Sequence, residues 1–146
     1  MHSFEETRLL PCASRDLYDV VMDIEAYPQF LPWVAAARIL RRSGDDLDAE
    51  LVAEFAGMRH SFQTTDRFLA GKMIEIRLKQ GPFRFLESYW SFDDLGPESC
   101  RVHFSIEFAF RNLMLDVVAA PVFTTACRQM VAAFERRALQ GKGKHA

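Results

Sequence analysis

The chain has 146 residues, a formal net charge of −2, and 49% hydrophobic against 26% charged residues. This length predicts a single domain that buries about two-thirds of the surface of its unfolded chain. The slightly acidic balance, with a pI near 6.1, lacks the excess of positive charge typical of proteins that bind nucleic acid.

The cysteines and the N-terminus indicate the compartment. Cys12, Cys100 and Cys127 are odd in number and far apart, which favours reduced thiols in a cytosol. The N-terminal segment 1–6 is acidic where a signal peptide would be basic, and the longest mostly apolar runs are far shorter than a membrane span. We expect a soluble, intracellular protein.

The first third of the chain predicts one strand and two short helices. Residues 3–10 form the strand, which ends at Pro11. Ser14 is expected to be the N-cap of an amphipathic helix whose apolar positions are Leu17, Val20, Val21 and Ile24. The following segment Tyr27–Trp33 holds prolines at 28 and 32, and each disfavours helix at the residue before it, so we expect at most a second short helix or turn.

The middle of the chain predicts strands in hairpin succession, with polar turns at 43–46 and 93–97. Alternation of apolar and polar residues is clearest in the second and last of them. Such strands are antiparallel neighbours with one apolar and one solvated face, and Asp48, Glu50 and Glu54 are expected on the solvated face. The predicted strands are Val34–Arg42, Leu47–Phe55, His60–Ala70, Met73–Lys79, Phe85–Phe92 and Cys100–Phe110.

The segment Leu113–Leu139 predicts one long helix with a wide apolar arc. One stripe is Val118, Val122, Ala126, Met130 and Ala133, and a second beside it is Phe123, Cys127, Val131 and Phe134. Pro121 predicts a bend. At 1.5 Å per residue the helix spans roughly 40 Å, and no other element is large enough to cover the apolar face of the sheet.

These elements predict an α+β fold. A curved antiparallel sheet of six to seven strands grips the long C-terminal helix, and two short helices follow the first strand. We expect one domain over residues 1–140 and a disordered tail over 141–146.

The sequence contains no recognisable catalytic or metal-binding motif. His-x-His, Cys-x-x-Cys and His-Glu-x-x-His are absent, as are a nucleophile elbow and a glycine-rich phosphate loop. We therefore expect no metal, no required cofactor and no enzymatic activity. Glu87 shares one face of its strand with Phe85 and Tyr89, so it faces inward if that face is the buried one. Leu86, Trp90 and Phe92 compete for that side.

Thirteen phenylalanines are more than one helix-on-sheet layer requires. Two interpretations stay open: a dense aromatic core, or an apolar pocket lined by rings. The large rings in question are Phe30, Trp33, Phe55, Phe62, Phe83, Phe85, Trp90, Phe104, Phe108 and Phe123.

Three segments, together with the order of elements, resemble the coenzyme Q-binding START-like family of the polyketide cyclase/START superfamily. They are Tyr27–Trp33, the turn 81–83 leading to Trp90-Ser91-Phe92, and the helix end 134–138, and the resemblance covers nearly the whole chain. It implies a helix-grip fold (START-like, Bet v 1-like) with a hydrophobic tunnel between helix and sheet. By the same resemblance, the tunnel mouth lies near Tyr27, Phe30 and Trp33, with Phe83 opposite.

The resemblance also implies a function: non-enzymatic binding of ubiquinone or a similar polyisoprenoid lipid, as a carrier or chaperone supporting respiration. The apolar tail supplies the driving force, and Tyr27, the Trp33 indole or Thr125 could donate to the headgroup. The predicted ligand-binding residues are Tyr27, Phe30, Trp33, Phe55, Phe62, Phe83, Trp90, Phe104, Phe108, Val118, Val122, Phe123 and Met130. We expect a cytoplasmic protein, peripheral at the inner face of the membrane, in transient contact with that membrane or a respiratory complex.

Two alternatives remain. Bacterial relatives in this family include the ribosome association toxin, so the chain is alternatively a toxin-like regulator that binds ribosomal subunits. That role needs a positive surface, for which the candidates are Arg38, Arg41, Arg42, Arg136, Arg137, Lys142 and Lys144. The third hypothesis is an enzyme of the cyclase or hydratase kind, but the sequence offers no convincing acid–base pair.

Overall fold

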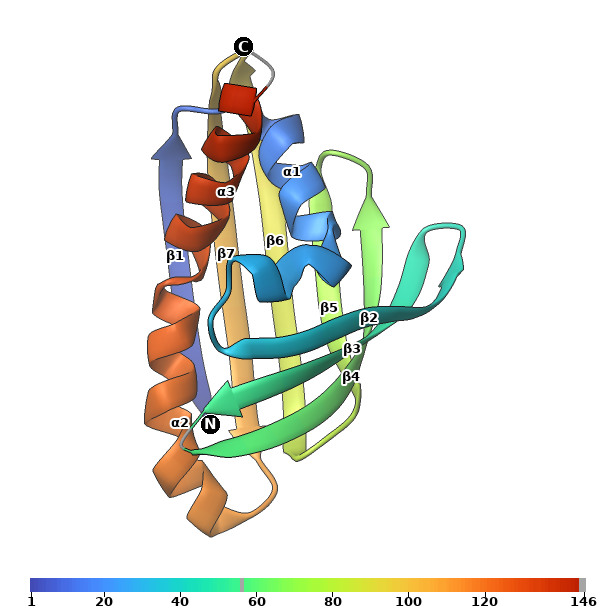
Figure 1. The fold of residues 1–146 in the computed structure, drawn as a ribbon, viewed down its shortest axis with the longest axis vertical. Helices are drawn as coiled ribbons and strands as arrows, with labels where there is room; N and C mark the ends of the chain where they lie inside the picture. The colour runs from blue at the N-terminus through green and yellow to red at the C-terminus, as the bar shows by residue number, and fades with distance from the viewer. Residues whose placement is uncertain (56, 145–146) are drawn as a thin grey trace.

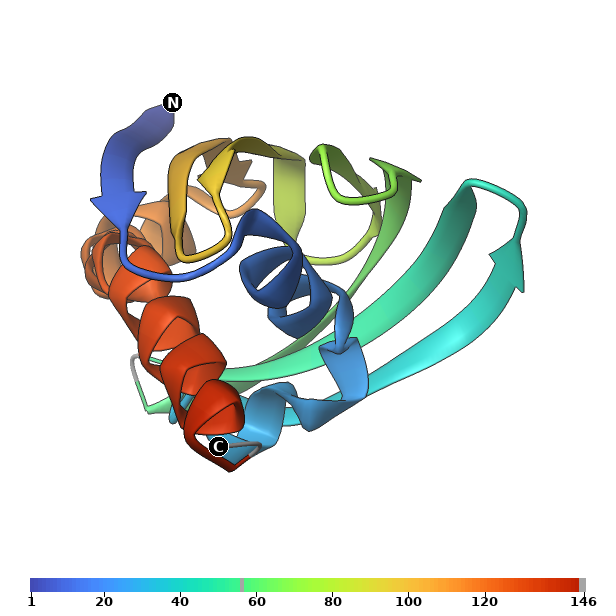
Figure 2. The same ribbon diagram turned by 90° about the horizontal axis from the view of Figure 1, so that it is seen from above.

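A seven-stranded antiparallel sheet curls around the helices in the computed structural model, which describes residues 1–55 and 57–144 (Figure 1). The strand order is β1-β7-β6-β5-β4-β3-β2. From above, the sheet bends round the space that α1 enters, and α3 runs along its open side (Figure 2). The predicted fold is confirmed. The strands are β1 (His2–Leu10), β2 (Val34–Ser43), β3 (Asp46–Phe55), β4 (Met58–Leu69), β5 (Met73–Gln80), β6 (Phe83–Gly96) and β7 (Ser99–Phe110).

Hairpins generate this order, because each strand from β2 to β6 pairs with the next along the chain. The first strand instead pairs with the last, with Phe4 opposite Ile106. The hairpin of β6 and β7 is longer than predicted: Asp93 and Asp94 pair with Arg101 and Cys100. The turn therefore occupies residues 97–98, and its predicted start at residue 93 was wrong.

Two short helices follow β1, as predicted: α1 (Ser14–Met22) and the 3₁₀ helix η1 (Ile24–Gln29), which contains Pro28. Ser14 is the first residue of α1 and is buried, whereas Ala13 occupies the N-cap position without a side-chain hydrogen bond. The expected N-cap role of Ser14 was wrong.

The C-terminal helix consists of two consecutive segments, α2 (Leu113–Arg128) and α3 (Met130–Lys144) (Figure 1). The backbone is helical through Pro121. The helix is interrupted at Gln129, whose N–H donates to the Ala126 carbonyl in a tighter turn. The interruption therefore falls eight residues beyond the proline at which the sequence predicted a bend. The backbone stays helical to Lys144, within the segment 141–146 for which disorder was expected.

The structure decides which apolar stripe of this helix faces the sheet. Phe123 and Phe134 are 3% and 1% exposed, whereas Val118 and Val122 are 51% and 42% exposed. The prediction that both valines face the core was therefore wrong. Two adjacent stripes in a wide apolar arc look alike in sequence, and the contact with the sheet selects one of them. The buried residues of this face are Ala119, Ala120, Phe123, Cys127, Val131, Ala133, Phe134 and Ala138.

The segment Leu113–Gln140 has the length and apolar composition that a membrane-crossing helix needs. The core helix of a globular fold meets the same two criteria. In this structure α2 contacts β1, β3 and β7, and α3 contacts α1.

One carboxylate on the expected solvated face is buried. Asp48 accepts hydrogen bonds from Lys79 Nζ at 2.6 Å, Thr65 Oγ1 at 2.8 Å and Arg41 Nε at 2.9 Å, and its side chain is 3% exposed. These donors, Lys79 first, lower the pKa of Asp48 to about 2. The expectation of a solvated Asp48 was wrong, because the long side chains of Arg41 on β2 and Lys79 on β5 cover it.

Phenylalanines fill one end of the space between sheet and helix. Phe83 is fully buried and stacks on Phe110 with ring centroids 4.6 Å apart. Its ring also meets Phe62 at 5.3 Å and Phe123 at 5.5 Å in edge contacts. Rings from three strands and α2 therefore form a dense core beside the cavity described below.

The turn before β6 brings backbone against the Phe62 side chain, which yields a prediction. Gly81 has φ +152°, and a Cβ added there would lie 2.5 Å from Phe62 Cβ; Gly96 has φ +141° and open space around it. Both Gly→Ala changes incur backbone strain of order 1–3 kcal/mol. Gly81→Ala adds overpacking of roughly 1–3 kcal/mol. Denaturant unfolding should show the larger loss for Gly81→Ala, and equal losses would contradict the close approach.

Candidate functional site

A cavity of about 80 Å³ lies between the concave face of the sheet, η1 and the C-terminal helix. Its lining is almost entirely apolar. A water molecule needs about 10–15 Å³ by this measure, so the cavity has room for several waters. It is smaller than the roughly 300–1,000 Å³ of pockets that hold drug-sized ligands. The lipid-sized void expected from the sequence is therefore largely filled by side chains.

The structure brings together seven of the predicted ligand-binding residues on the wall of this cavity. They come from η1, the segment after it, three strands and both C-terminal helices. These residues are Tyr27, Trp33, Phe62, Trp90, Phe104, Phe123 and Met130. Tyr27, Trp33 and Met130 are half-exposed, so on their side the cavity lies directly beneath the surface.

The other predicted residues lie elsewhere. Phe83 and Phe108 are fully buried in the adjoining core, so Phe83 is not at a tunnel mouth. Phe30 is half-buried and packs edge-on against Phe134 at 5.3 Å. Val118 and Val122 point away from the sheet, as described above. The side chain of Phe55 lies outside the described part of the structure.

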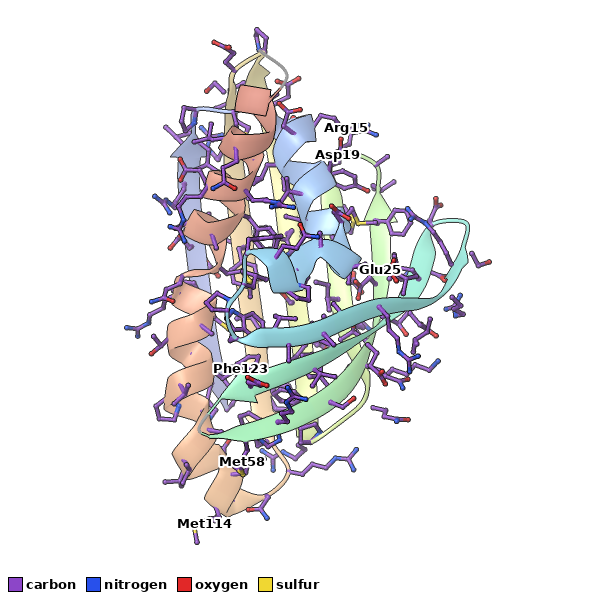
Figure 3. All side chains as sticks on the ribbon, viewed as in Figure 1. Arg15, Asp19, Glu25, Met58, Met114 and Phe123 are labelled. Atoms are coloured by element: carbon purple, nitrogen blue, oxygen red, sulfur yellow. The ribbon has the colours of Figure 1, made fainter. Side chains whose placement is uncertain are left out.

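Two of the three predicted headgroup donors already have acceptors in the protein. The Tyr27 hydroxyl donates to the Val21 carbonyl. The Thr125 hydroxyl donates to the Pro121 carbonyl at 3.0 Å, on an exposed part of α2. The third, Trp33, contacts Phe123 edge-on with ring centroids 6.1 Å apart. Phe123 extends from α2 towards the sheet (Figure 3).

The most informative lining residue, Asp66, escaped the sequence analysis. Its side chain lines the apolar cavity, and the residue is 5% exposed. The signal was present in β4, where Phe62, Thr64, Asp66 and Phe68 fall at every second position. Asp66 belongs to the same alternating series, since side chains two residues apart share a face of a strand.

The surroundings of Asp66 favour its neutral form. Its neighbours in register are Leu47 on β3 and Ile76 on β5, and Thr64 Oγ1 donates to its Oδ1 at 2.8 Å. Burial raises the pKa of Asp66 to about 7, the hydrogen bond from Thr64 opposes this only in part, and the charge of Asp48 adds to it. Burial likewise raises the pKa of Tyr27 well above its usual value, and the Asp66 charge adds to this.

The sequence left open whether Glu87 faces the interior, and the structure places it on the outside. Glu87 is exposed on β6, while Leu86, Ser88 and Trp90 face the interior and line the cavity. Ser88 Oγ donates to the Ser105 carbonyl at 3.0 Å. Glu87 is therefore not a cavity residue.

Neither a metal site nor a reactive thiol stands out. Over residues 1–55 and 57–144, no group of three or more His, Cys, Asp and Glu is placed to hold a metal ion. All three cysteines are buried. Burial raises the pKa of the Cys100 and Cys127 thiols to about 12, which disfavours the nucleophilic thiolate.

A second apolar region lies on the outside, at the end of the molecule where α2 begins. Met58, near the turn between β3 and β4, and Met114 of α2 both lie at this end (Figure 3) and line a shallow groove together with Leu115 and Val118. The exposed apolar side chains here are Met58, Leu113, Met114, Val117, Val118 and Val122.

A curved antiparallel sheet that grips a long C-terminal helix over an apolar cavity defines a helix-grip protein. Residues 10–135 match the family described as polyketide cyclase / dehydrase and lipid transport, and the chain belongs to this family.

Named relatives carry different functional names. The ribosome association toxin RatA of Rickettsia prowazekii is 36% identical, over 94% of this chain and 97% of that protein. The mitochondrial coenzyme Q-binding protein COQ10 of Drosophila melanogaster is 26% identical over 90% of this chain, which spans 56% of that protein.

Solved structures agree on the fold. An 18 kDa protein from Caulobacter crescentus is 36% identical with a TM-score of 0.76, over 98% of this chain and 99% of that one. The Zhui aromatase/cyclase from Streptomyces sp. R1128 has a TM-score of 0.84 over 95% of this chain and 94% of that one, at 14% identity. At that identity it shows the fold alone. The fold is thus shared by an enzyme and by proteins named for binding.

The two buried aspartates predict opposite effects of pH on stability. The pKa of Asp66 is raised to about 7 in the folded protein. Below pH 4 the carboxyl is neutral in both the folded and the unfolded chain, so its ionisation does not affect stability. As pH rises from 4 to 7 the unfolded chain loses this proton first, and the folded protein becomes progressively less stable. At about 1.4 kcal/mol per unit, the loss is roughly 4 kcal/mol. Asp66→Asn should remove this loss in unfolding measured from pH 4 to 8.

Asp48 provides the comparison, because its pKa is shifted in the opposite direction, down to about 2. Its stabilising contribution is present above pH 4 and is lost as pH falls towards 2. Asp48→Asn should therefore destabilise the protein at neutral pH. If Asp66→Asn leaves the pH dependence between 4 and 8 unchanged, the neutral state of buried Asp66 is contradicted.

Proposed function

We propose that this protein binds an apolar ligand, ubiquinone or a similar polyisoprenoid lipid, as a non-enzymatic carrier that supports respiratory electron transport. The observation that carries the proposal is the apolar cavity between sheet and helix, with few polar groups in its wall. This is how proteins hold apolar ligands while fixing their orientation. The relative named as coenzyme Q-binding supports the choice of ligand.

The cavity volume of about 80 Å³ sets a condition on this function. A quinone head with even a short tail requires side chains in the wall to move. Trp33 and Met130 are the candidates, because both line the cavity and are only partly buried. Met130 also begins α3 directly after the break at Gln129. The gain is roughly 25 cal/mol for each Å² of apolar ligand surface removed from water.

A carrier requires no cofactor and no catalytic pair. The shared fold of an aromatase/cyclase keeps the enzyme hypothesis relevant. Among the described lining residues, however, Asp66 is the one carboxylic acid and no histidine accompanies it. General acid–base catalysis normally employs two groups with separated pKa values. We therefore assign binding rather than catalysis.

The exposed apolar side chains around Met58 and Met114 support transient contact with a membrane surface, from which such a ligand would be collected. Apolar groups at one end of a protein insert into the headgroup and acyl boundary. We place the protein in the cytoplasm, peripheral at the inner face of the membrane, with a respiratory complex as recipient.

Ribosome association is the second candidate, favoured by relatives at 36% identity that carry this name. The surface charges favour it less. Arg38 pairs with Glu50 at 2.9 Å and Arg41 with Asp46 at 2.8 Å, so much of the β2 charge is neutralised. Co-sedimentation with ribosomal subunits that falls steeply with salt would support this candidate.

The direct test is the bound molecule itself. Protein purified from a quinone-producing host should release a quinone on organic extraction, identified by its ultraviolet spectrum and by mass spectrometry. A control protein purified in parallel shows the background. Repeated extracts without quinone or other polyisoprenoid would contradict the carrier function.

A matched pair of variants tests the cavity. Trp33→Ala removes a half-exposed lining ring and should weaken binding of a short-tail ubiquinone about tenfold while lowering the melting temperature only slightly. Phe4→Ala removes a half-buried ring that contacts Phe104 at 6.2 Å from outside the cavity. It should lower the melting temperature without changing affinity. The opposite pattern would make Trp33 a core residue only.

A further inference from the structure

Four polar side chains face the cavity besides the indoles, and the structure shows which of their hydrogen-bonding groups are already used. They are Tyr27 on η1, Thr64 and Asp66 on β4, and Ser88 on β6. The Tyr27 hydroxyl donates to the Val21 carbonyl and the Ser88 hydroxyl to the Ser105 carbonyl. The Thr64 hydroxyl donates to Asp66. These three hydroxyl donors are therefore occupied, and the remaining donor among the four side chains is the O–H of a protonated Asp66 carboxyl.

The position of Asp66 favours the protonated form of that carboxyl. Apolar Leu47 and Ile76 flank it on the neighbouring strands, and no cation contributes to the shift of its pKa to about 7. A neutral carboxylic acid has one O–H donor. Because Thr64 already donates to Oδ1, the carboxyl is held in one orientation against the cavity.

We propose that Asp66, oriented by Thr64, donates a hydrogen bond to a carbonyl or ether oxygen of the apolar ligand, the chemistry presented by a quinone head. This inference rests on the proposed function and adds the atom that would select the head. Thr64 is a positioning residue, and Asp66 is the contact. A ligand amine would require an ionised Asp66, and burying two charges in this apolar wall is costly.

Such a contact explains how an otherwise apolar cavity discriminates between ligands. Apolar contacts with a tail scarcely distinguish one isoprenoid from another. A buried polar group does distinguish them, since a ligand without an oxygen leaves that group without a partner. Asp66 would therefore direct the oxygen-bearing head into the cavity and leave the tail towards the half-exposed side at Trp33 and Met130.

The experiment uses the full chain and three probes with the same single-isoprenoid tail: a ubiquinone, a hydrocarbon without oxygen, and a primary amine. Calorimetry in one detergent gives affinities for wild type, Asp66→Leu, Asp66→Asn and the control Glu87→Gln. Glu87 is exposed on β6 and lines no part of the cavity.

Asp66→Leu should weaken ubiquinone binding about tenfold without weakening hydrocarbon binding. Asp66→Asn, whose amide also donates, should stay within about threefold of wild type, and Glu87→Gln should leave the ratio of the two affinities unchanged. Equal affinities of wild type and Asp66→Leu for ubiquinone would overturn the role of Asp66 while leaving the carrier function standing.

Two further outcomes are decisive. If wild type prefers the amine and Asp66→Asn loses it, the proposed ligand chemistry is wrong and the carboxylate binds a cation. If wild type binds none of the three probes, the carrier function itself fails, and the inference about Asp66 fails with it.

Discussion

The packing of one face of the C-terminal helix onto the concave face of the sheet is the contact on which the rest of the structure depends. A curled antiparallel sheet with one apolar face needs a cover, and α2 and α3 provide it through residues such as Phe123 and Phe134. At the Phe83 end this packing is dense. At the Asp66 end it leaves a small cavity. The same contact thus creates both the core and the candidate site.

Asp66 lowers the stability of this arrangement. A buried carboxyl without a cation is destabilising at neutral pH, and Asp48 on the other face shows the alternative, with Lys79 and Arg41 beside it. Groups that reduce stability while facing a cavity are candidates for function. Asp66 is the one carboxylic acid among the described residues that line an otherwise apolar cavity.

The relatives leave two functions for one fold. The polyketide cyclase / dehydrase and lipid transport family includes chains named for ribosome association and for coenzyme Q binding. A fold does not fix an activity, so the argument must rest on the site. Here the cavity favours an apolar ligand, and Arg38 and Arg41 of β2 are each paired with a carboxylate.

The sequence by itself determined the elements and their order, because alternation in β3 and β7 and the apolar arc of the long helix are local patterns with fixed periods. It also determined most of the aromatic wall. Only the tertiary structure decided three matters: that Phe123 and not Val122 faces the sheet, that the helix breaks at Gln129, and that Asp66 lies in the cavity while Asp48 is covered by cations. Each depends on contacts between elements distant in the chain, which a local pattern does not encode.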